Sequence, residues 1–174
     1  MLKNSSRNKV TALVALSVLS VTIASATNFV SGKAQAVQCD ATVVMLTQIG
    51  CQFLEFEMGV DHKFKPKSAN DCKAINTKTG TDRLAKAGPL KLKPGKYVFR
   101  VTNKNVPYTL GFWIRSKGYS CKNPLHKLTK TSISGGGLTL GKTRDYEVTL
   151  KAGEEYVYSC PLNPTPDYPI VVTN

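Results

Sequence analysis

The C-terminal stretch from Tyr156 to Val172, which reads YVYSCPLNPTPDYPIVV, constrains the fold of this chain more than any other feature. Tyr156, Tyr158 and Cys160 recur at a period of two, which is typical of a half-buried β-strand. Four prolines follow, and each fixes φ and removes a backbone donor, so this segment cannot continue a strand ladder. They are Pro161, Pro164, Pro166 and Pro169. The stretch therefore predicts a strand, a stiff loop and a second strand.

Short β-type runs recur upstream of this stretch. Strands are predicted over residues 42–47, 52–57, 96–103, 107–115, 138–140 and 144–150. In two of these runs the alternation is clear. Tyr97, Phe99 and Val101 lie on one face of the first, and Tyr146, Val148 and Leu150 are expected to point inward in the second. Turns are predicted at Pro94-Gly95 and across the three glycines 135–137, so the sequence indicates an all-β domain.

Residues 58–88 depart from this β pattern. They are polar, rich in Lys, Asn and Asp, and they contain Pro66 and Cys72. We predict a long loop or a short helical insertion here, tied to the rest of the domain through Cys72.

The first 36 residues have the organisation of a signal peptide. Met1 to Val10 is basic and free of acids, and Thr11 to Ala24 is apolar but shorter than the roughly 20 residues that span a bilayer. Cleavage is expected after Ala26 or Ala36, which leaves 37–174 as a single domain. A retained anchor helix is the competing interpretation. Either way, the folded part is expected outside the cytoplasm, in a periplasmic or extracellular location.

Five cysteines lie after the apolar run, an informative number for a chain expected in an oxidising compartment. The odd number leaves at least one thiol over, and the absence of any C-x-x-C pair argues against a zinc ribbon. We expect two bridges and one thiol. Among Cys39, Cys51 and Cys72, the sequence leaves both Cys39–Cys72 and Cys51–Cys72 open.

The chain is strongly basic, with 24 Lys and Arg against 11 Asp and Glu and a formal net charge of +13. Such a charge attracts an anionic partner, either an acidic protein or a membrane surface, over a Debye length of roughly 8 Å at physiological salt. Simple solubility of a Lys-rich surface is the alternative. Lys outnumbers Arg and no basic helix is evident, so nucleic acid is not expected as a partner.

The order of strands and turns from Leu92 to Val172 resembles the cupredoxins, the blue-copper protein family. The matching patterns are L-x-P-G-x-Y-x-F-x-V, then Y-x-V-x-L-x-x-G-x-Y-x-Y-x-C-P, then I-x-V. The resemblance implies an antiparallel Greek-key β-sandwich, here with an N-terminal insertion. It covers about half of the chain and follows the strand pattern and turns more than the metal ligands.

The residues at the family's copper-ligand positions are largely replaced. In cupredoxins a Cys, two His and usually a Met hold one copper ion. Here Cys160 is present, but Tyr108 stands where the first His would be and Asn163 stands where C-x-x-H would place the second. The resemblance therefore implies a dismantled copper site, and Tyr108, Asn163 and Tyr168 become candidates for a remodelled pocket.

Two further expectations concern Cys160. In the plant branch of the family, the phytocyanins, a Cys placed like Cys121 pairs with a Cys beside the copper loop, which implies a Cys121–Cys160 bridge here and removes the thiolate that copper needs. The alternative is an unconventional copper site, in which Cys160 is joined by His126, His62 and Met58.

Motifs of the common enzyme classes are absent. The sequence contains no G-x-S-x-G elbow, H-E-x-x-H pair or P-loop, and nothing marks a base or an oxyanion site beside a cysteine. We therefore expect an exported, non-catalytic binding or accessory protein with no cofactor. A copper-binding electron carrier or copper shuttle is the alternative.

Overall fold

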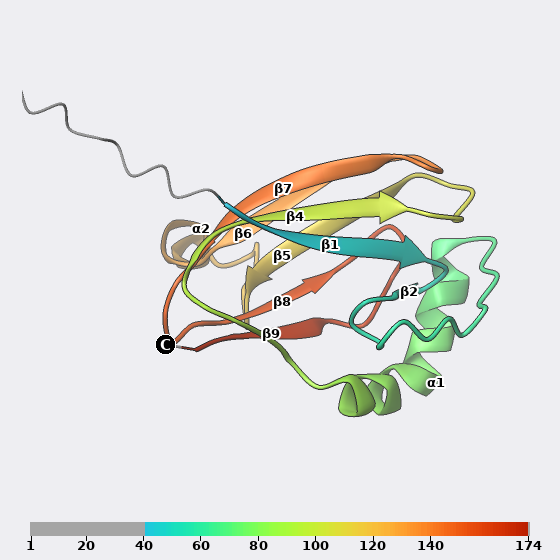
Figure 1. Ribbon diagram of the computed structural model, residues 1–174, viewed down its shortest axis with the longest axis horizontal. Coiled ribbons are helices and arrows are strands. Elements are labelled where there is room, and N and C mark those ends of the chain that lie inside the picture. The colour runs from blue at the N-terminus through green and yellow to red at the C-terminus, as the bar shows by residue number, and fades with distance from the viewer. Residues whose placement is uncertain (1–40, 174) are drawn as a thin grey trace, which may run out of the picture. The chain divides into compact units, whose positions relative to one another are not determined.

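The computed structural model describes residues 41–173, and the strands of this range form two β-sheets (Figure 1). Within this range neither helix is both long and apolar enough to cross a bilayer. The predicted signal peptide, its cleavage sites at Ala26 and Ala36, and Cys39 lie outside the described residues.

Each sheet contains one parallel pair of strands. The first sheet has the order β2-β1-β4-β7, formed by Gln52–Phe53, Thr42–Ile49, Gly95–Asn103 and Thr143–Leu150. The second has the order β3-β9-β8-β5-β6, formed by Leu90–Leu92, Tyr168–Val172, Glu155–Ser159, Leu110–Ser116 and Ser132–Leu138. The pairs β1–β4 and β3–β9 are parallel and the other pairs are antiparallel. The sheets are therefore mixed, and the expectation of purely antiparallel pairing is wrong, because long crossovers join the parallel pairs.

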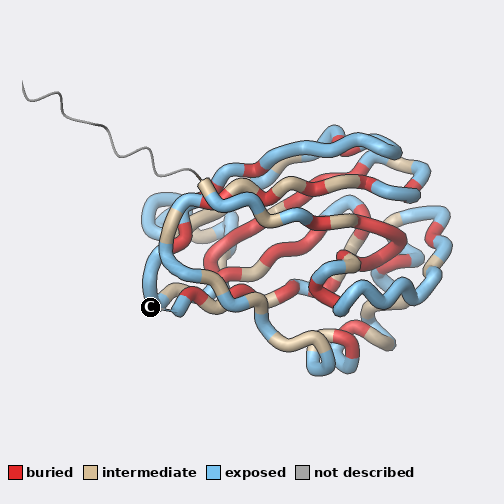
Figure 2. The backbone as a smooth tube through the Cα atoms, in the orientation of Figure 1, coloured by how far each residue is buried: buried red, intermediate tan, exposed pale blue. Residues whose placement is uncertain are grey.

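An aromatic core joins the two sheets, as a β-sandwich requires. Phe99 of β4 lies 5.8 Å from Phe112 of β5 and 6.2 Å from Tyr158 of β8, measured between ring centroids. Figure 2 shows buried backbone along the strands between the two exposed outer faces. The predicted inward residues of β7 are all buried, and the three β4 residues that were predicted to share one face are buried as well.

Three local predictions are wrong. The predicted strand 52–57 ends at Phe53, and the chain then turns, although Phe56 is still buried. The glycines 135–137 lie inside β6 instead of forming a turn, and β6 ends at Leu138, where a strand over 138–140 was predicted to begin. A Cβ on Gly135 would lie 2.9 Å from the Tyr146 ring, so glycine lets the strand approach that ring closely.

Helix α1 (Ala69–Ala87) replaces the loop or short helix predicted within residues 58–88. The Asp71 carboxylate accepts the backbone N–H groups of Lys67 at 2.8 Å and Ser68 at 2.9 Å, so it caps the helix and its own pKa is lowered. Gly88, with φ of 70°, ends the helix and donates to the Leu84 carbonyl at 3.1 Å.

The attachment of α1 to the sandwich combines a disulfide, polar contacts and the packing of Leu84 and Ala87, which are partly buried against the core. Only three of its residues are buried: Cys72, Gly80 and Arg83. None of the three is a large apolar side chain, so hydrophobic burial alone does not hold this helix in place. The second helix, α2 (Pro124–Thr129), has no buried residue at all.

Candidate functional site

Asn163, in the loop between β8 and β9, is fully buried and forms the centre of a hydrogen-bonded cluster. Its Oδ1 accepts from the Tyr108 hydroxyl at 3.0 Å and from the Cys51 N–H at 3.2 Å. Its Nδ2 donates to the Ile49 carbonyl at 3.0 Å, and its backbone N–H donates to the Cys160 sulfur at 3.1 Å. Both polar atoms of the side-chain amide are thus hydrogen-bonded, and these bonds tie the loop to the turn between β1 and β2.

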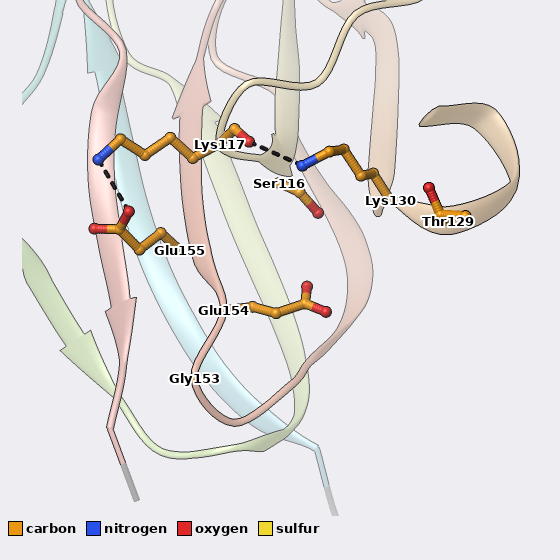
Figure 3. A pocket seen from close by; sticks show the side chains of 7 residues that line it. All are labelled: Ser116, Lys117, Thr129, Lys130, Gly153, Glu154 and Glu155. Carbon is orange, nitrogen blue, oxygen red and sulfur yellow. Dashed lines mark hydrogen bonds and ion pairs between the residues drawn. The ribbon is translucent and has the colours of Figure 1, made fainter. Parts of the chain in front are cut away.

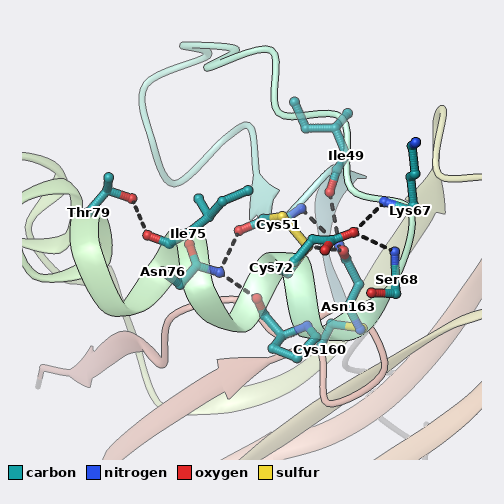
Figure 4. Close-up of a disulfide and its surroundings, with 12 residues drawn as sticks. Ile49, Cys51, Lys67, Ser68, Cys72, Ile75, Asn76, Thr79, Cys160 and Asn163 are labelled. Atoms are coloured by element: carbon teal, nitrogen blue, oxygen red, sulfur yellow. Dashed lines mark hydrogen bonds between the residues drawn. A yellow bond between two sulfur atoms is a disulfide. The ribbon is translucent and has the colours of Figure 1, made fainter.

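A disulfide between Cys51 and Cys72 covers this cluster (Figure 4). The Cys72 sulfur lies 2.8 Å from Asn163 Oδ1 and 3.9 Å from the Tyr108 hydroxyl. Because a disulfide sulfur carries no hydrogen, the first contact is a close packing contact and not a hydrogen bond. Of the two pairings left open by the sequence, Cys51–Cys72 is therefore the one formed, and Cys39–Cys72 is wrong. The bridge holds α1 across this end of the sandwich.

Cys160 is a buried free thiol that is 1% exposed. Its sulfur accepts from the Asn163 N–H, and its own N–H donates to Thr165 Oγ1 at 3.0 Å. Burial raises the pKa of Tyr108, and the neighbouring Cys160 raises it further. Tyr108 therefore remains protonated at neutral pH and serves as a donor to Asn163.

The expected bridge between Cys121 and Cys160 is wrong, because both cysteines are free. The register of β5 against β8 pairs Ser116 with Tyr156, so the chain leaves β5 beside the first residues of β8, whereas Cys160 follows the last. Five residues of strand span roughly 16 Å, and a disulfide needs Cα atoms within about 7 Å. Cys121 is exposed, beyond the end of β5.

The other candidate copper ligands do not approach Cys160. His62 Nε2 lies 2.8 Å from Glu57 Oε2, and His126 Nδ1 accepts the Ser120 N–H at 3.0 Å. Figure 1 places α2, which carries His126, at the end of the sandwich opposite to α1. Met58 is 70% exposed. Within residues 41–173, no three His, Cys, Asp or Glu side chains are grouped so that they could hold a metal ion.

Tyr168, the third candidate pocket residue, belongs to a second buried cluster centred on Glu57. The Tyr168 hydroxyl donates to Glu57 Oε1 at 2.5 Å and accepts from the Phe53 N–H at 3.3 Å. Arg83 binds the same carboxylate with two hydrogen bonds, from Nη2 at 2.6 Å and from Nε at 2.9 Å. Glu57 and Arg83 are thus a buried, bidentate ion pair.

The charge of Glu57 is stabilised by its partners. Burial raises the pKa of Glu57, but the hydrogen bonds from Arg83 and Tyr168 outweigh burial, and the net pKa is lowered. Burial of the ring, followed by the charge and the hydrogen bond of Glu57, raises the pKa of Tyr168 well above its usual value. A small cavity of about 240 Å³ opens beside the cluster. It is lined by Glu57, Met58, Val60, His62, Arg83, Lys86 and Ala87.

The two clusters are neighbours, since Arg83 Nη2 also donates to the Cys51 carbonyl at 3.3 Å. Tyr108, Asn163 and Cys160 were predicted from their place in the resemblance, and these three residues do meet. Glu57 and Arg83 were not predicted, because they lie 26 residues apart in polar surroundings that give no periodic signal. Comparison of the chain with protein-family models and with curated proteins finds no match.

Proposed function

We propose that this protein is an exported, non-catalytic binding or accessory module of the cupredoxin type, with a closed polar cluster in place of a copper site and a basic surface for an anionic partner. The observation that carries the proposal is the Asn163 side chain. It occupies a ligand position in the resemblance, yet both of its polar atoms are bonded within the protein.

Two structural features support the cupredoxin part of the proposal. Two sheets pack around one aromatic core, and the residues matched to three ligand positions, Tyr108, Cys160 and Asn163, gather at one end of that core. The Cys51–Cys72 disulfide supports export, because such bridges persist in oxidising compartments.

The non-catalytic part rests on the state of the buried polar groups. A catalytic nucleophile needs a positioned base and access for a substrate. Cys160 has neither a histidine contact nor exposed surface, and Glu57 is held by Arg83, Tyr168 and His62. These contacts fit a structural role.

A specific observation favours the alternative of a copper carrier: Cys160 is a thiol and is not consumed in a disulfide. In that alternative Tyr108 or Asn163 would have to leave the cluster, and an imidazole would have to arrive from a distant loop. Titration of the protein with Cu(II) separates the two functions. We expect no intense thiolate-to-copper absorption, and its appearance would support the carrier.

A restoration experiment tests the family relationship. The double variant Tyr108→His/Asn163→His places imidazoles at both of the replaced positions beside Cys160, and we expect it to acquire the thiolate-to-copper absorption that the wild-type protein lacks. Near-UV circular dichroism must show that the variant is folded. A folded variant that stays colourless with Cu(II) would argue against a cupredoxin origin of this site.

The anionic partner is tested separately by binding to acidic polymers and surfaces. We expect binding that weakens strongly between low and physiological salt, since the attraction acts through exposed lysines. Equal binding at both salt concentrations would contradict a charge-driven contact.

A further inference from the structure

Helix α2 (Pro124–Thr129) presents its two leucines to solvent, and His126 is its only residue that is partly buried. Leu125 is 66% exposed and Leu128 is 84% exposed, and residues three apart lie on the same face of a helix. His126, on the other side, accepts the Ser120 N–H and is partly buried. A surface helix normally has the opposite arrangement, so these leucines are available to a partner.

The conformation of the segment is fixed locally, so the leucines do not fold back onto the domain. Asn123 caps α2 by accepting the Leu125 N–H at 3.0 Å, and Pro124 occupies the first turn. At the other end, the Lys130 N–H donates to the His126 carbonyl at 3.0 Å. These contacts hold Leu125 and Leu128 outward.

Uncompensated positive charge surrounds the leucines. Lys122 and Lys127 are exposed and form no ion pair within the described part of the chain. Two neighbouring lysines are engaged instead: Lys117 pairs with Glu155 at 3.0 Å, and Lys130 Nζ donates to the Lys117 carbonyl at 3.3 Å (Figure 3). The sequence contains no Asp or Glu from residue 83 to residue 144. Glu154 and Glu155, which line a pocket with Thr129 and Lys130, are already bound to Tyr156 and Lys117. The α2 segment therefore exposes basic as well as apolar side chains.

Aromatic side chains support the base of the helix. Tyr119 lies 6.3 Å from the His126 ring and 6.1 Å from the Trp113 ring, between centroids. Trp113 is itself fixed by the Arg115 guanidinium, 4.0 Å from its ring, and by a 2.9 Å hydrogen bond to Ser132. Trp and Tyr are favoured where a protein meets the boundary between lipid and water.

We propose that α2 docks on an anionic lipid surface, with Leu125 and Leu128 in the interface and Lys122 and Lys127 at the lipid phosphates. The proposal rests on the proposed function only for the anionic nature of the partner. A lipid surface accepts a projecting apolar tip without a matching pocket, whereas a protein partner must supply one. Two basic and two apolar side chains on one short segment fit the combined requirement of charge and insertion.

Vesicle co-sedimentation of the full chain tests this proposal, with phosphatidylcholine vesicles compared with vesicles that also contain phosphatidylserine. The sole tryptophan, Trp113, gives an independent fluorescence readout near α2. We expect binding to the serine-containing vesicles only. The variant Leu125→Ser/Leu128→Ser is expected to weaken binding at least about tenfold, because it removes the apolar contact with the lipid.

Charge variants test the second half of the contact. Lys122→Gln/Lys127→Gln is expected to weaken binding more than tenfold, at about fivefold for each lysine near the membrane surface. Lys117→Gln is the matched charge control, since Lys117 is already paired with Glu155, and we expect less than about a twofold change. Val43→Ser/Met45→Ser removes two exposed apolar side chains from β1 and is expected to bind like the wild type.

The outcomes separate this proposal from the proposed function. If the leucine variant binds as tightly as the wild type, or if charge-free vesicles bind equally well, insertion of α2 into an anionic surface is wrong. If the protein binds polyglutamate in a salt-dependent way but binds no vesicles, the lipid proposal fails and the anionic partner stands. Binding to neither would overturn both.

Discussion

Strand β5 runs from one end of the sandwich to the other, and the two ends differ in which side chains they bury. At the end before β5, which we call the Cys160 end, Tyr108, Asn163 and Glu57 place their polar atoms in hydrogen bonds beneath α1. At the end after β5, the α2 end, Leu125 and Leu128 are exposed. The first arrangement stabilises the fold and uses these three side chains within the protein, whereas the second contributes little to the fold and leaves its leucines free for a partner. The contrast indicates the α2 end as the place to test for binding of a partner.

The buried ion pair should give the largest effect at the Cys160 end. The variant Glu57→Ala leaves the Arg83 guanidinium buried without its carboxylate, and we expect the free energy of unfolding to fall by about 4 kcal/mol. Chemical denaturation provides the measurement. The control Glu147→Ala, on the exposed face of β7, should change stability by less than about 0.5 kcal/mol. Equal effects of the two variants would contradict a structural role for Glu57.

The same carboxylate predicts a pH dependence. Because the pKa of Glu57 in the folded protein lies below its ordinary value of 4.5, its contribution to stability is complete above that pH. The contribution is lost as the pH falls through the lowered pKa. Asp71 and Asp145 also have lowered pKa values, so the difference between wild type and Glu57→Gln isolates Glu57. This difference in denaturation midpoint should shrink on acidification.

Asn163 should give the next largest effect. The variant Asn163→Ala removes the acceptor of the Tyr108 hydroxyl and Cys51 N–H and the donor to the Ile49 carbonyl, and we expect a loss of about 3 kcal/mol. Asn105→Ala, in an exposed loop, is the control. A loss below 1 kcal/mol would show that this cluster is not what closes the Cys160 end.

Gln48 should give the smallest effect, and it tests whether a buried amide stabilises the protein only when it is hydrogen-bonded. It is as deeply buried as Asn163, yet neither of its side-chain polar atoms has a partner within residues 41–173. The variant Gln48→Met keeps the shape and removes the unpaired amide, so we expect stability between unchanged and about 1 kcal/mol higher. A large loss in the same denaturation assay would mean that burial matters more here than pairing.

The strands were predictable where one face is buried. The period of two predicted that Tyr146 of β7 points inward and that the tyrosines of β4 and β8 lie on shared faces, and all of these tyrosines are buried. Helix α1 was underestimated because it buries only Cys72, Gly80 and Arg83, which form no apolar stripe.

The candidate site was predictable in its members but not in its contacts. The resemblance brought Tyr108, Cys160 and Asn163 to notice, and these residues do meet. Two contacts depend on where α1 packs: the disulfide Cys51–Cys72 over Asn163, and the ion pair of Glu57 with Arg83. The local sequence pattern does not predict the position of α1. The predicted bridge between Cys121 and Cys160 was wrong because spacing along the chain does not show beside which end of β5 each cysteine lies.

Native-state thiol labelling tests the contrast between the two ends most directly, since each end carries one free cysteine among residues 41–173. The labelled protein is digested, and the Cys121 and Cys160 peptides are quantified by mass spectrometry as a function of time. We predict that Cys121 reacts at once and that Cys160 reacts about a thousandfold more slowly, because its labelling requires opening of the folded domain. Labelling of Cys160 at a rate close to that of Cys121 would show that the Cys160 end is open, and would contradict the account.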